Sequence, residues 1–248
     1  MMNPILWGKM RVLGISDVHS PLWLKDLEEA VQRAGEKADL LLIAGDMVDR
    51  GNAKYYKKVI DILAKLDAKM VAVFGNDEYD NVKDIIREEN PEVTFLEDES
   101  TVMEINGRRI GIVGSRGSLE MPTTWQKRNI PGIEKLYSER VRLIGELLMK
   151  LREKVDVTVL LTHYATTTQT MRGENPRAWR YLGHRGFEKY MREGLVDVAV
   201  HGHVHNGKRT AKVGNTKVYN VAFPLWWQLV EIDLKREEQV SIEEFLSK

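Results

Sequence analysis

Side chains that can bind a metal ion follow five short apolar segments of this chain. The segments are 12–15, 40–44, 70–74, 157–161 and 196–200. The residues that come soon after them are Asp17 and His19, Asp46 and Asp49, Asn76 and Asp77, His163, and His203 and His205. If the segments are aligned parallel strands, their carboxyl ends open on a shared crevice where ligands bind. We therefore expect these side chains to meet in one site.

Such a site combines carboxylate, amide and imidazole groups. The candidate metal ligands are Asp17, His19, Asp46, Asn76, His163, His203 and His205. Carboxylates gathered in a desolvated pocket repel one another, and divalent cations offset that repulsion. Imidazole with carboxylate suits Mn, Fe, Co, Ni or Zn, of which we expect Mn. This many ligands can hold two divalent ions that share one carboxylate, an arrangement suited to in-line displacement at phosphorus.

The elements that must position these residues follow from hydrophobic periodicity. Apolar residues recur at helical spacing over 22–35, 55–66, 82–89, 133–152 and 187–193. Continuous apolar runs such as 40–44 are typical of buried parallel strands. Asn106-Gly107 between two strand-like runs predicts a hairpin with a type I′ turn.

The remaining segments give weaker patterns. We expect 115–132 and 162–183 to be irregular. We expect the chain beyond 200 to form antiparallel strands, with turns at 214–215 and 235–239. Trp226 and Trp227 are then expected to divide between the core and the surface of a strand, with self-association as an alternative role.

Parallel strand–helix units followed by hairpins favour an α/β fold with two packed mixed β-sheets flanked by helices, an α/β/β/α sandwich. Because no repeat or long linker interrupts the pattern, we expect a single domain over residues 1–248. The chain has no cysteine, which excludes disulfides, thiolate metal sites and cysteine nucleophiles.

The charge balance limits the classes of partner. Lys plus Arg and Asp plus Glu each number 37, so the formal net charge is zero. General binders of nucleic acid or membrane surfaces carry a basic excess, and the composition argues against both. The chain has neither an apolar run of membrane-spanning length nor the pattern of a signal peptide, and we expect a cytoplasmic location.

Five motifs occur in a fixed order along residues 12–205: Asp17-Val18-His19, Gly45-Asp46-Met47-Val48-Asp49, Gly75-Asn76, His163, and Gly202-His203-Val204-His205. Together this set resembles the calcineurin-like metallophosphoesterase superfamily. The resemblance implies that Asp17, His19 and His205 hold one metal ion. It implies that Asn76, His163 and His203 hold a second, and that Asp46 bridges the two.

The resemblance also implies the reaction, which is hydrolysis of a phosphate ester by a water that bridges the metal ions. The substrate would be a small phosphate ester or a nucleotide. The stretch Gly45 to Gly51 resembles the version found in protein Ser/Thr phosphatases, which implies that Arg50 contacts phosphate. Asp49 beside it is a further candidate catalytic residue.

One position departs from the family pattern. The family usually has Gly-Asn-His followed by Asp or Glu, whereas here Asp77 takes the place of the histidine and Glu78 follows. An ionised Asp77 cannot protonate a leaving alkoxide and repels a dianionic phosphate monoester. We therefore expect a preference for phosphodiesters. The alternatives are a metal-binding scaffold with weak or no activity, and a phosphomonoesterase or protein phosphatase-like enzyme.

Residues outside these motifs have two interpretations. Arg172, Arg177 and Arg180 lie with Trp179 in the segment after His163 and could contact substrate. The alternative is an ordinary solvated loop with paired charges.

The two histidines outside the family motifs, His184 and His201, are expected to have structural roles. The sequence leaves the oligomeric state open.

Overall fold

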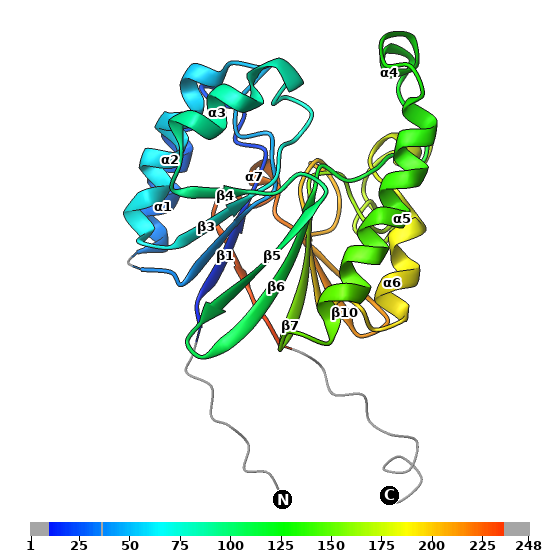
Figure 1. The fold of residues 1–248 in the computed structure, drawn as a ribbon. Helices are drawn as coiled ribbons and strands as arrows, with labels where there is room; N and C mark the ends of the chain where they lie inside the picture. The colour runs from blue at the N-terminus through cyan, green and yellow to red at the C-terminus, as the bar shows by residue number, and fades with distance from the viewer. Residues whose placement is uncertain (1–9, 36, 236–248) are drawn as a thin grey trace, which may run out of the picture.

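The computed structural model describes residues 10–35 and 37–235, and its strands form two β-sheets (Figure 1). The first sheet has the order β11-β1-β2-β3-β4. Its strands are β1 (Val12–Ile15), β2 (Leu40–Ile43), β3 (Lys69–Ala72), β4 (Val93–Phe95) and β11 (Val230–Ile232). β1 to β4 run parallel, and β11 is antiparallel to β1.

The second sheet has the order β5-β6-β7-β8-β10-β9. Its strands are β5 (Glu99–Ile105), β6 (Arg108–Ser115), β7 (Val157–Thr162), β8 (Val198–His201), β9 (Thr210–Val213) and β10 (Thr216–Asn220). The four inner strands, β6, β7, β8 and β10, are parallel, and an antiparallel strand closes each edge.

Helices cover the outer face of each sheet (Figure 1). On the first sheet lie α1 (Leu24–Ala34), α2 (Tyr56–Leu63) and α3 (Lys83–Glu89). On the second lie α5 (Ile133–Arg152) and α6 (Glu188–Arg192), with α4 (Thr124–Asn129) beyond one end of α5. The short helix α7 (Phe223–Trp226) lies between β10 and β11 in the chain.

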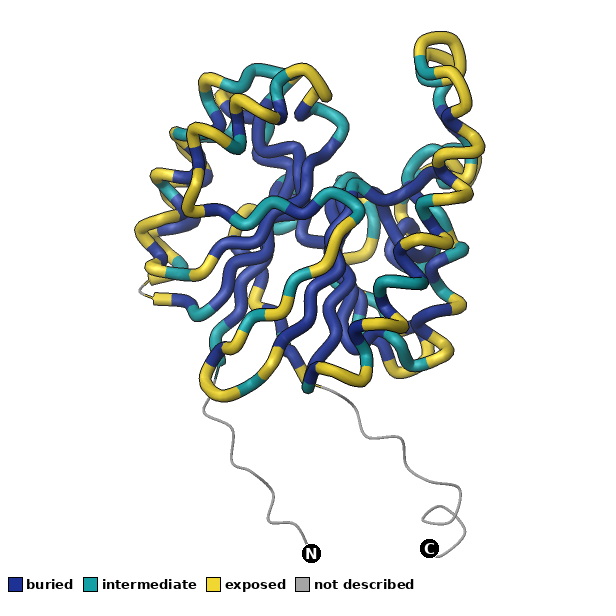
Figure 2. Tube along the Cα trace, in the orientation of Figure 1, coloured by how far each residue is buried: buried dark blue, intermediate teal, exposed yellow. Residues whose placement is uncertain are grey.

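The alternation of side chains along the strands builds the layers. In β2, Leu41 and Ile43 pack toward α1 and α2, whereas Leu40 and Leu42 pack into the core shared with the second sheet. Figure 2 shows the result, with strands buried along most of their length and helices exposed on their outer sides. The expected α/β/β/α sandwich is therefore confirmed.

Several expected elements have the expected bounds. The helix over 133–152 is α5. The hairpin turn has Asn106 at φ 50° and Gly107 at φ 75°, as a type I′ turn requires. The helix expected over 55–66 is shorter, because 3₁₀ turns flank α2 at both ends.

Three expectations were wrong. The segment 115–132 is not wholly irregular, since Thr123 and Gln126 form a reciprocal capping box that starts α4. The strands beyond 200 are not all antiparallel, because β10 pairs with β8 in parallel. Trp226 and Trp227 do not lie in a strand: Trp226 ends α7, and Trp227 follows it with φ 54°.

Two further differences are smaller. The short edge strand β4 has no clear alternating pattern, and the sequence did not reveal it. The turn expected at 235–239 lies, beyond Lys235, outside the described residues. Among the helices of the described part, none combines the length and apolar character needed to cross a membrane.

Candidate metal centre

The candidate ligands follow strands of both sheets. β1, β2 and β3 of the first sheet lead to Asp17, Asp46 and Asn76. β7 and β8 of the second sheet lead to His163 and to the His203–His205 segment. Because the inner strands of each sheet are parallel, these residues all come from carboxyl ends. The site is thus built where two sheets meet.

The ligand atoms cluster tightly. One group with ligand atoms within 4.8 Å of one another is Asp17, Asp46, His163 and His203, and a second is Asp17, His19 and His205. Asn76 joins the first group, since its Oδ1 lies 3.0 Å from His163 Nε2. All seven candidate ligands therefore converge. Asp17 is common to both groups, whereas the resemblance assigns the shared position to Asp46.

One buried atom indicates that a cation fits here. His19 Nε2 is buried, and no described residue offers it a hydrogen-bond partner. The Asp17 Oδ1 atom lies 3.8 Å from it, beyond hydrogen-bond distance. A buried polar atom without a partner is rare in folded proteins. A divalent cation between these groups would satisfy both, and the donor set suits Mn, Fe, Co, Ni or Zn.

The backbone at the site is held in an uncommon conformation. Asp17, His19, Asp46 and His203 have φ values of 57°, 43°, 53° and 66°, in the left-handed region. Asp and His enter this region more easily than most residues, but each instance carries strain that the surrounding fold must offset. Such strain gathers at functional sites.

Hydrogen bonds orient the imidazole and carboxylate groups. His163 Nδ1–H donates to the Ala44 carbonyl at 2.9 Å, which leaves Nε2 facing Asp46 Oδ2 at 3.3 Å. Asp17 Oδ2 accepts from the backbone N–H of His203 at 2.9 Å. This kind of support fixes the tautomer and direction of a metal-binding histidine.

Burial and charge together shift the pKa values of these groups. Burial alone would lower the pKa of His163, but the charge and hydrogen bond of Asp46, the charge of Asp17 and the bond to Ala44 together outweigh it and raise that pKa to about 9. Burial, then the charge of His163, lowers the pKa of His203 to about 4. Burial opposes ionisation of Asp17, but His205 and His163 outweigh it and lower the Asp17 pKa.

Glu78 is a buried residue of the site that the sequence analysis did not single out. Its carboxylate accepts hydrogen bonds of 2.6–3.2 Å from the backbone N–H groups of Asp46, Met47, Val48 and Gly75. It thereby ties the Asp46 loop to the Asn76 loop. Burial, and then the charge of Asp46, raises the pKa of Glu78 to about 7. The available signal was the family position after Gly-Asn-His, where an acidic residue is usual.

Gly75 permits the close approach of these two loops. A Cβ atom at this position would lie 2.1 Å from Asp46 Oδ1 and 2.5 Å from the Asp46 backbone nitrogen. Real Cβ contacts are not that short, so any side chain here displaces Asp46. The position of Asp46 thus depends on the absence of a side chain at Gly75, in the tight contact between the loops that follow β2 and β3.

The candidate catalytic residues lie around the ligand cluster. Asp77 Oδ2 lies 3.2 Å from His19 Nδ1, and these residues form a third cluster with Asp49. Burial favours the neutral form of Asp77, but hydrogen bonds from His19, the Arg50 backbone and Asn76, with the charge of His19, together outweigh it and lower the Asp77 pKa, which favours the ionised form near neutral pH. Arg50 is different, because its side chain is 82% exposed and lies beside Asp49.

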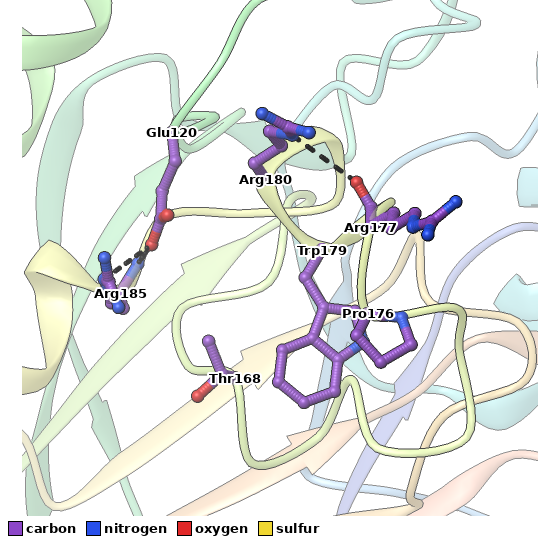
Figure 3. Close-up of a pocket in the computed structure, with 7 residues that line it drawn as sticks. All are labelled: Glu120, Thr168, Pro176, Arg177, Trp179, Arg180 and Arg185. Atoms are coloured by element: carbon purple, nitrogen blue, oxygen red, sulfur yellow. Dashed lines mark hydrogen bonds and ion pairs between the residues drawn. The ribbon is translucent and has the colours of Figure 1, made fainter.

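The arginine-rich segment after His163 lines a cavity of about 270 Å³ (Figure 3). Arg177 and Arg180 lie on its wall, whereas Arg172 does not line it.

The two histidines outside the family motifs have structural partners. His184 Nδ1 accepts from the Gly186 N–H, and buried His201 bonds Thr170 and the Gly202 carbonyl.

Comparison with known proteins identifies the family and supports the fold. The sequence model described as calcineurin-like phosphoesterase matches residues 10–207, and the protein belongs to that family. It is a metal-dependent phosphoesterase, a hydrolase that acts on ester bonds. A search of curated protein sequences found no match.

Solved structures with the same fold include two hydrolases. Phosphopantetheinyl hydrolase (PptH) from Mycobacterium tuberculosis is 18% identical with a TM-score of 0.67, over 95% of this chain and 100% of that one. A dimetal phosphatase from Danio rerio is 13% identical with a TM-score of 0.54, over 85% and 86%. At these identities the likeness concerns the fold alone.

Proposed function

We propose that this protein hydrolyses phosphodiesters of small molecules or nucleotides with two divalent cations, of which Mn is the first choice. The observation that carries the diester preference is the position of the Asp77 carboxylate, 3.2 Å from His19 at the edge of the ligand cluster, where its lowered pKa favours the ionised form. The family membership supports phosphate-ester hydrolysis in general. The substrate preference is our own inference from the residues around the site.

We assign the candidate ligands to two cation sites. Asp17, His19 and His205 would hold one cation, Asn76, His163 and His203 the other, with Asp46 shared between them. When bound, divalent cations acidify water and offset charge on phosphoryl oxygens. The protein supplies the fixed positions: Glu78 anchors the Asp46 loop, and Ala44 holds the His163 ring.

Asp77 discriminates between substrates by charge. A phosphodiester carries one negative charge, whereas a monoester near neutral pH carries nearly two. At a separation of about 5 Å and an effective dielectric constant of about 20, an added charge is disfavoured by roughly 3 kcal/mol. Because Asp77 is ionised, it cannot donate a proton to the leaving group, which favours esters with acidic leaving groups. Arg50 lies at the rim, and its exposed side chain could reach a bound phosphate.

The test compares two substrates that share a leaving group. Protein supplied with Mn²⁺ is assayed with bis(p-nitrophenyl) phosphate and with p-nitrophenyl phosphate. We expect the diester to be preferred, a chelator to abolish turnover, and Asp77→His to shift the ratio toward the monoester. A monoester preference that Asp77→His leaves unchanged would contradict the role of Asp77. Tight metal binding without turnover of either ester would instead indicate a scaffold.

A further inference from the structure

A cationic cavity lies on the loops that follow β6 and β7. Its volume is about 270 Å³, and its walls include Arg177, Arg180, Arg185, Glu120 and the indole of Trp179. Figure 3 shows Glu120 and Arg185 together on one side, Arg177 on the other, and Arg180 between them. The cavity has room for a phosphate group with part of the organic group attached to it.

The charges in this cavity do not balance. Glu120 neutralises Arg185, since Arg185 Nε lies 3.1 Å from Glu120 Oε1 and the Arg185 backbone N–H donates to the same oxygen at 3.2 Å. Within residues 10–35 and 37–235, Arg177 and Arg180 form no ion pair. The lining therefore carries a surplus of two positive charges in a chain whose formal net charge is zero.

The walls are held in place before any ligand arrives. The Met121 backbone N–H donates to the Arg180 carbonyl at 2.9 Å, and the Glu120 N–H donates to the Gly183 carbonyl at 3.0 Å. The Trp179 indole N–H donates to the Glu174 carbonyl at 3.2 Å. Because the two backbone bonds join the loops and the indole bond fixes Trp179, the backbone of the walls needs little ordering when a ligand binds.

The cavity is connected to the candidate metal centre through one small apolar cluster. Trp179 packs against the buried cluster of Ala165, Met171 and Val204. Ala165 follows His163 by two residues, and Val204 lies between His203 and His205. The wall of the cavity is therefore packed against the segments that carry His163, His203 and His205.

We infer that this cavity binds a second phosphate group of the substrate, remote from the ester that is hydrolysed. Guanidinium groups bind phosphate through paired, charge-assisted hydrogen bonds, and in the described part of the chain Arg177 and Arg180 have no acidic partner to displace. Trp179 offers a flat apolar surface for the organic part next to that phosphate. The inference deepens the proposed function and rests on it, because the molecule bound in the cavity is a substrate only if the protein hydrolyses phosphodiesters. The substrate class becomes phosphodiesters with a terminal phosphate.

The binding part of the inference is tested without metal. Chelator-treated full-length protein is titrated calorimetrically with inorganic pyrophosphate. We expect binding that weakens at least about tenfold in Arg177→Ala/Arg180→Ala, because both unpaired charges are removed. Arg142→Ala is the matched control, since Arg142 is an exposed arginine on α5 that pairs with Glu146. It should bind as the wild type does.

A variant that should bind pyrophosphate more tightly provides a second test, because misfolding cannot explain tighter binding. Glu120→Gln removes the one acid of the lining and frees Arg185, so it should tighten pyrophosphate binding. If the wild type does not bind, or if the double variant and Glu120→Gln both bind like the wild type, the cavity is not an anion site.

The substrate part is tested with two dinucleotides. Thymidylyl-(3′→5′)-thymidine is compared with the same molecule carrying a 5′-terminal phosphate, so the diester is identical. We expect a KM at least about tenfold lower for the phosphorylated form, and no difference in Arg177→Ala/Arg180→Ala. Equal KM values in the wild type would overturn the inference and leave the proposed function standing. Turnover of neither dinucleotide, nor of any aryl diester, would refute the proposed function, and calorimetry alone would then decide the anion site.

Discussion

Glu78 is the residue whose removal should weaken both the stability of the fold and metal binding. Its fully buried carboxylate accepts hydrogen bonds from the backbone N–H groups of Asp46, Met47, Val48 and Gly75. Glu78→Ala leaves all these donors without a partner in the protein interior. It also opens a space behind Asp46.

The size of the effect follows from the number of orphaned donors. Each buried N–H without a partner is destabilising by about 1–3 kcal/mol, so four together give roughly 4–12 kcal/mol. Water entering the vacated space would satisfy some donors, which favours the lower end. Even about 4 kcal/mol is a large part of the stability of a typical domain. Glu78→Gln keeps one acceptor oxygen and should lie between Glu78→Ala and the wild type.

Urea denaturation of metal-free protein measures this difference directly. Glu92→Ala is the control, because Glu92 is exposed and pairs with Lys57 at 3.3 Å. It should change the free energy of unfolding by less than about 1 kcal/mol. Elemental analysis of the folded Glu78→Gln variant should show reduced metal content, since the Asp46 loop loses its anchor. A Glu78→Ala protein within about 1 kcal/mol of the wild type would refute the reasoning.

Three further outcomes follow from the same structure. Asp46→Asn should lower phosphodiesterase activity by at least about a hundredfold with an unchanged circular dichroism spectrum, and full activity would contradict a shared ligand role. Gly75→Ala should reduce both metal content and thermal stability, because its Cβ would meet Asp46 Oδ1 at 2.1 Å. Burial opposes ionisation of Glu97, but Lys83 and Arg87 together outweigh it and lower the Glu97 pKa from 4.5. The ionised Glu97 therefore stabilises the folded state above about pH 4.5, and this contribution is lost as the pH falls. Glu97→Gln should therefore be less stable by about 0.5–1 kcal/mol at pH 7, with a gap that closes toward pH 3 in urea titrations.

Much of the architecture could be predicted because its causes are local. Apolar runs such as 40–44 and the helical spacing of 133–152 each encode an element within a few residues. The capping box at Thr123 was equally local and was overlooked. The parallel pairing of β8 and β10 could not be seen in the same way, since it joins strands that are separated by the antiparallel strand β9 in the chain.

The sequence by itself determined which chemical groups are available and that each follows a strand, from Asp17 to His205. Only the tertiary structure decided how they are held. It places the Glu78 carboxylate on the Asp46 loop, sets the His163 ring on the Ala44 carbonyl and leaves His19 Nε2 without a hydrogen-bond partner among the described residues. The first two contacts join residues 32 and 119 positions apart. A pattern of neighbouring residues carries no information on such pairs, because their geometry depends on how two sheets pack.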